Sequence, residues 1–222
     1  MAWDATKPAS AEAKSLAPAQ IQGNWAALED WLNDLSNFPT TPAAFSAGKL
    51  GWTLIQTQSA AASATIDFTS GITSTYDQYV VTLTDMLAAS AASPSLYMRI
   101  SQSAVFDIGL NYAYAYSTFT TTPSTASIGA TASSVMAIAD TLSNTSFQTL
   151  SGQLFLNNPT RTTGLHTINY QFSWKNSSGV LTGNIGTAEF TANTNAIDGI
   201  RFFLSVGNIT SGTFALYGVR KT

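Results

Sequence analysis

Alternating apolar side chains constrain the fold of this chain most strongly, and they are clearest near its C-terminal end. Two apolar runs, residues 200–206 and 213–219, flank a polar segment that contains glycine. In the first run the residues on one face of a strand are Ile200, Phe202 and Leu204. This period of two, with turn residues between the runs, predicts a terminal β-hairpin. Because both faces carry apolar groups, we expect the hairpin to be central in a sheet.

The same pattern recurs upstream, from Lys49 onward. We expect further strands at residues 52–58, 64–69, 78–85, 96–103, 110–119, 133–139, 152–157, 167–175 and 185–191. The connections between them are rich in Ser, Thr, Gly and Asn, which are turn residues. Many short strands with such turns and no second helix predict a mainly β domain over residues 49–222. The expected architecture is an antiparallel β-sandwich or jelly roll.

The N-terminal residues differ from this pattern. Residues 1–17 are mostly small and polar and contain Pro8, which opposes helix formation, so we expect an extended arm. Trp3 is its only aromatic side chain. Trp3 is either a solvated residue of a tail or the plug of a pocket on a partner or a neighbouring subunit.

Residues 18–36 have the pattern of one short α-helix. Pro18 stands near its first turn, and residues 37–48, which contain two prolines, form a linker after it. A heptad stripe with gaps of four, three, four and three is formed by Ile21, Trp25, Leu28, Leu32 and Leu35. The helix packs either on its own domain or in a parallel bundle between identical subunits. Its place between an arm and a linker favours the oligomerising bundle.

Composition limits the classes of partner. Charged residues are only 9% of the chain, against about 25% in ordinary soluble domains, so burial of much of the surface in an assembly is expected. The net charge of −3 and the scattered basic residues argue against nucleic-acid binding. No run approaches the ~20 apolar residues of a membrane helix, and the start is unlike a signal peptide. We therefore expect that the chain does not insert into a membrane. We expect it to fold in the cytoplasm, where it is made.

Residues that carry catalytic or metal chemistry are scarce. The chain has no cysteine, and His166 is its only histidine, so one chain cannot supply a site with two histidine ligands. No serine lies in a GxSxG elbow, and a surface or hydrogen-bonded role for His166 is the favoured interpretation. The carboxylates fall mainly at strand ends and loops, where aspartate caps turns. We expect a protein that is not an enzyme and has no cofactor or metal.

One aromatic set has a clear periodicity. Tyr112, Tyr114 and Tyr116 alternate with alanines, which places the three rings on one face of one strand. Tyrosine rings with polar tips suit a subunit interface, the edge of a core or a glycan-binding face. We rank subunit packing first, a core edge second and glycan contact third.

Two parts of the chain, its start and its body, resemble tailed-bacteriophage structural proteins. Residues 3–9 read WDATKPA and residues 21–29 read IQGNWAALE, which is similar to the usual WDxTKPA arm and IrxNWxAlE helix of those N-termini. The sequence of residues 63–79, together with 198–202 and 207–218, resembles a β-rich domain of phage fibre and head-surface proteins. The middle of the chain, residues 120–144, matches no such pattern.

The resemblance implies a virion surface component, commonly trimeric, that is synthesised in the host bacterial cytoplasm. It implies an outward β-domain and an N-terminal anchor formed by Trp3, Asp4, Lys7 and Pro8. The first alternative is a trimeric head decoration or head-fibre protein bound to the major capsid protein, which the short chain favours. The second is a tail-fibre or tail-tip protein, attached to the tail or baseplate, that recognises host surface glycan. A glycan-cleaving enzyme ranks last.

Overall fold

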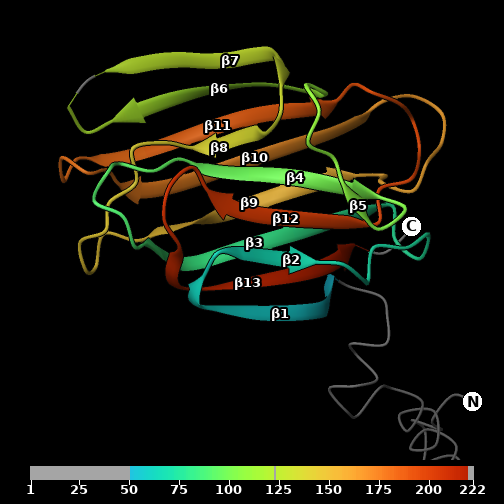
Figure 1. The fold of residues 1–222 in the computed structure, drawn as a ribbon, viewed down its shortest axis with the longest axis horizontal. Coiled ribbons are helices and arrows are strands. Elements are labelled where there is room, and N and C mark those ends of the chain that lie inside the picture. Colours follow the sequence, from blue (N-terminus) through green and yellow to red (C-terminus); the bar gives the residue numbers. More distant parts are fainter. Residues whose placement is uncertain (1–50, 123, 220–222) are drawn as a thin grey trace, which may run out of the picture. The chain divides into compact units, whose positions relative to one another are not determined.

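The computed structural model describes residues 51–122 and 124–219, and strands dominate this part of the chain (Figure 1). The strands are β1 (Trp52–Ser63), β2 (Thr65–Phe68), β3 (Gln78–Ala88), β4 (Leu96–Gln102), β5 (Val105–Phe106), β6 (Tyr112–Thr120), β7 (Thr125–Ser133), β8 (Met136–Ala139), β9 (Leu150–Asn157), β10 (His166–Lys175), β11 (Leu181–Phe190), β12 (Gly199–Leu204) and β13 (Ile209–Val219). This confirms the predicted mainly β class.

Two antiparallel sheets contain these strands. The larger has eight strands in the order β1-β13-β3-β9-β10-β11-β6-β7. The smaller has five, in the order β2-β12-β4-β5 with β8 paired to β4. In Figure 1 the smaller sheet lies in front of the larger one.

Contacts within the chain divide it into two units, Met1–Leu50 and Gly51–Thr222. The predicted arm (1–17), helix (18–36) and linker (37–48) lie outside the described residues. The same holds for the anchor residues Trp3, Asp4, Lys7 and Pro8 and for the helix stripe of Ile21, Trp25, Leu28, Leu32 and Leu35.

The apolar faces of both sheets contribute to one core. In β10 every second residue is buried, from His166 to Trp174, and the residues between them are exposed. From the facing sheets, the rings of Phe202 in β12 and Phe214 in β13 meet with centroids 5.5 Å apart. Both side chains are fully buried. The alternation seen in the sequence therefore identifies the faces that pack between the sheets.

The prediction of a C-terminal hairpin is wrong, because the two strands do not pair with each other. Its two runs do form strands, but β12 lies between β2 and β4 in the smaller sheet, whereas β13 lies between β1 and β3 in the larger. The connection between them carries the chain from one sheet to the other and includes Gly207, whose φ of 76° suits glycine. Alternation identifies a strand and its buried face, but it does not identify the strand that pairs with it.

Two strands were missed by the sequence pattern, β5 and β7. β7 is an edge strand that pairs only with β6, and Ile128 is its one large apolar residue. Most of its residues are small and exposed. An edge strand held by backbone hydrogen bonds needs no apolar alternation, so the usual signal is absent.

Candidate functional site

The tyrosine row of β6 faces the interior. Tyr112 and Tyr116 are buried and Tyr114 is partly buried. The Tyr112 hydroxyl donates to the carbonyl of Asp107 (3.0 Å), and the Tyr116 hydroxyl donates to Oδ2 of Asp140 (3.1 Å). This placement matches the core-edge alternative, because Tyr112 and Tyr116 present no exposed face to a subunit or glycan. Periodicity shows that three rings share a face, whereas the covering layer decides whether that face is exposed.

Burial also fixes the protonation of these tyrosines. It raises the pKa of Tyr112 and of Tyr170 well above the ordinary value. The pKa of Tyr116 is raised first by burial and then by the negative charge of Asp140. These hydroxyls therefore stay neutral at physiological pH and act as structural hydrogen-bond donors.

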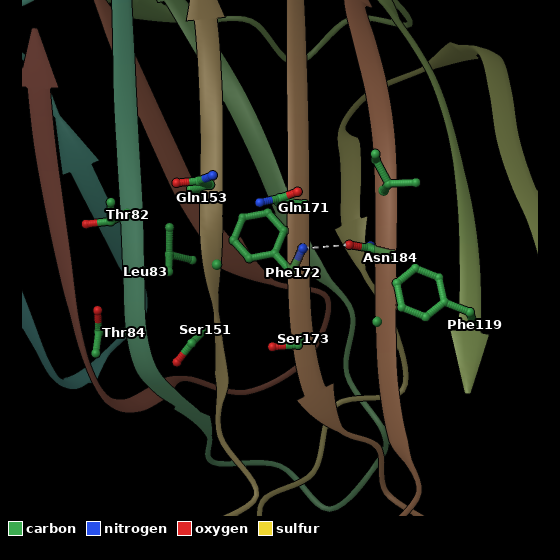
Figure 2. Close-up of a pocket in the computed structure, with 13 residues that line it drawn as sticks. Thr82, Leu83, Thr84, Phe119, Ser151, Gln153, Gln171, Phe172, Ser173 and Asn184 are labelled. Atoms are coloured by element: carbon green, nitrogen blue, oxygen red, sulfur yellow. Dashed lines mark hydrogen bonds between the residues drawn. The ribbon is translucent and has the colours of Figure 1, made fainter. Parts of the chain in front are cut away.

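Polar side chains of the larger sheet hold β8 in place. Asn184 in β11 donates through Nδ2 to the carbonyl of Ile138 (2.6 Å) and accepts from the Phe172 amide (3.0 Å; Figure 2). The Tyr170 hydroxyl donates to the carbonyl of Ala137 (3.0 Å). Since Asn184 is buried, both of its hydrogen bonds are needed to offset the loss of water.

His166 is buried at the start of β10. Its Nε2 lies 2.8 Å from the carbonyl of Asn195, and its Nδ1 has no partner in the described part of the chain. A catalytic triad needs a carboxylate on the second ring nitrogen, and none is placed there. Of the two expected roles, surface or hydrogen-bonded, the geometry agrees with the hydrogen-bonded one, whereas the surface role is wrong because His166 is fully buried.

The outer face of the larger sheet carries a hollow of about 670 Å³. It crosses β3, β9, β10, β11 and β6 (Figure 2). The side chains that line it from the outer face are Thr82, Thr84, Phe119, Ser151, Gln153, Gln171, Ser173 and Ile185. None of them is charged. We call this set the hydroxyl–amide face.

Two members of this face are apolar and exposed. Phe119 is 54% exposed and Ile185 is 60% exposed. The Phe119 ring lies across Gly183, where an added Cβ would meet Cε2 of the ring at only 2.5 Å. Glycine at this position therefore lets the ring lie close to the sheet and keep one side open to solvent. A second hollow, of about 450 Å³, continues from Ile185 toward β7.

This arrangement suits a neutral partner. Hydroxyls and amides offer both donors and acceptors, and an aromatic ring offers an apolar surface beside them. A neutral glycan or the surface of another subunit has matching chemistry. The sequence signal for this face was the run of Thr, Ser and Gln at the positions between core residues, which sequence reasoning did not single out.

Comparisons with protein-family models, with curated proteins and with solved structures find no match to this chain. Within residues 51–122 and 124–219 no helix is long and apolar enough to cross a membrane. The same residues contain no group of three or more His, Cys, Asp or Glu side chains that could hold a metal ion. Function is therefore inferred from the geometry of the exposed faces.

Proposed function

We propose that the chain is a non-enzymatic surface protein of a tailed-bacteriophage particle. The uncharged hydroxyl–amide face is the observation that carries this proposal, because it is a broad surface with little charge to repel a neighbour. The resemblance of residues 3–9 and 21–29 to phage N-termini supports the same assignment. Two antiparallel sheets around one core support a jelly-roll-like β-sandwich as the outward domain.

The form that we favour is a homotrimeric head decoration or head-fibre protein. In it the arm, residues 1–17, binds the major capsid protein, and the helices of residues 18–36 associate. An uncharged face with the exposed residues Phe119 and Ile185 is the kind of surface that neighbouring subunits cover.

Quantitative mass spectrometry of purified particles, combined with antibody labelling, tests this proposal. Hundreds of copies on the head are expected. Deletion of residues 1–17 should abolish attachment while the β-domain keeps its thermal unfolding transition. Absence of the chain from particles contradicts the whole proposal, and attachment of the shortened chain at full occupancy contradicts the anchor.

A second candidate function is recognition of host surface glycan by a tail fibre or tail tip. The hollow supports it, because Gln153 in β9 and Gln171 in β10 line it with amides, and the open ring of Phe119 lines it from β6. In that case a handful of copies at the tail is expected, and Phe119→Ala should weaken binding to host cells. Phe147→Ala is the matched control, since Phe147 is 97% exposed and lies outside the hollow. Equal binding by both variants contradicts this candidate.

A further inference from the structure

The outer face of the smaller sheet brings two arginines side by side. Arg201 in β12 is directly opposite Arg99 in β4, and on its other side it is opposite Asp67 in β2. The three side chains form one row across the sheet, with charges of negative, positive and positive. Like charges directly opposite each other destabilise a sheet, so the second arginine calls for an explanation.

Arg201 has its counter-ion. The Nε of Arg201 donates to Oδ1 of Asp67 (2.9 Å), and its terminal nitrogen Nη2 donates to Oδ2 (2.6 Å). The guanidinium carbon also lies 4.1 Å from the centroid of the Phe106 ring. This two-pronged pair engages both carboxylate oxygens of Asp67.

Arg99 is held in place without a counter-ion. Its Nε donates to the carbonyl of Ser134 (3.0 Å), and its guanidinium carbon lies 4.8 Å from the centroid of the Phe203 ring. It has no carboxylate partner among the residues that the structure describes. The carbonyl and the ring orient the guanidinium but do not neutralise its charge. Its two terminal nitrogens match the two oxygens of a carboxylate from outside the chain.

An aromatic side chain stands next to this guanidinium on the same face. Tyr97 and Phe203 are opposite each other in β4 and β12, and their rings meet edge to face with centroids 5.8 Å apart. Both are only partly buried. A ring beside a guanidinium matches a pyranose ring that carries a carboxylate, since the C–H side of the sugar can pack on Tyr97.

We propose that this face binds a carboxylated sugar, such as a hexuronic acid unit of an acidic polysaccharide. The carboxylate binds the guanidinium of Arg99 and supplies the counter-ion that Arg99 lacks among the described residues. The sugar ring packs against Tyr97. A short aspartate or glutamate side chain of a peptide would satisfy Arg99 but leave Tyr97 uncovered. The proposal concerns a different sheet from the hydroxyl–amide face and holds whether or not the chain belongs to a phage particle.

The test is calorimetric titration of the full chain with a tetrasaccharide of galacturonic acid and with its carboxyl-reduced counterpart, a tetragalactose. We expect binding of the acid only, weakened roughly 10- to 100-fold by Arg99→Gln. Arg99→Lys keeps the charge but loses the paired N–H donors of the guanidinium, so we expect an intermediate loss of affinity. Tyr97→Leu should weaken binding roughly 3- to 10-fold. Lys175→Gln removes one positive charge from an exposed position in β10 and should change nothing.

Several results would overturn the proposal. Equal binding of the reduced tetrasaccharide would remove the role of the carboxylate. If Arg99→Gln and Arg99→Lys both keep the wild-type affinity and the wild-type thermal unfolding, Arg99 is excluded as the residue that binds the carboxylate. If a tetraglutamate peptide binds as tightly as the sugar acid, or if Tyr97→Leu keeps full affinity, the face binds anions in general and does not recognise a sugar ring.

Discussion

Replacing Phe202 and Phe214 with leucine, singly and together, tests the placement of the last two strands in facing sheets. Each side chain is fully buried and its ring meets the other ring across the core. Leucine keeps the site apolar and most of its volume, so the fold should survive. Volume-conserving core substitutions usually cost less than about 1.5 kcal/mol, and the lost contact between the rings adds to this, so we expect about 1–3 kcal/mol from each.

The coupling between the two substitutions carries the information. A pair of aromatic rings contributes about 0.5–1.5 kcal/mol beyond the area it buries. Either single substitution removes this contribution, so the double variant should lose less than the sum of the singles by that amount. The measurement is denaturant unfolding of the full chain and its three variants, with equal slopes as the sign of an unchanged unfolding reaction.

Phe147 supplies the control because it is 97% exposed. Phe147→Leu should change the free energy of unfolding by less than about 0.5 kcal/mol, and it should add to Phe202→Leu without coupling. Coupling near zero between Phe202 and Phe214, with both singles destabilising, would refute the contact. The two strands would then not face each other across the core.

Three further predictions address the polar core and the assembly. Asn184→Leu should lower the free energy of unfolding by about 2–4 kcal/mol, because the Ile138 carbonyl and the Phe172 amide lose their buried partner. Asn169→Leu, at an exposed position of β10, is the control. The raised pKa of Tyr116 favours its neutral form in the folded chain, so the contribution of Tyr116 to stability is constant below about pH 10 and falls above it. In Tyr116→Phe the loss of stability above about pH 10 should be shallower by up to about 1.4 kcal/mol per pH unit in unfolding titrations. Leu28→Asp with Leu32→Asp should weaken the proposed trimer by placing charges in the helix seam, and a trimeric mass by light scattering would place the assembly contacts in the β-domain instead.

The positions of most strands were predictable because strand signals are local. In β10 each buried residue alternates with an exposed one, and the same alternation can be read from the letters of the sequence. β7 was not predictable in this way, since its small residues have no buried face to mark. The sequence also left two roles open for His166, surface or hydrogen-bonded, and only the tertiary structure places its Nε2 on the carbonyl of Asn195.

The candidate faces could be predicted only in part. The sequence showed that Tyr112, Tyr114 and Tyr116 share one face, but it did not show that this face packs inside the protein. The pairing of Arg201 with Asp67 joins residues 134 positions apart, and no local pattern marks it. The hydroxyl–amide face likewise draws its residues from five strands.

By itself the sequence determined the strand class, the buried side of most strands and the low charge of the surface. Only the tertiary structure decided that β12 and β13 belong to different sheets, that the tyrosines are covered and that Arg99 stands beside Arg201. The reason is physical. Alternation follows from the backbone geometry of each strand, whereas pairing and burial follow from contacts between segments far apart in the chain, such as Trp52 with Val219.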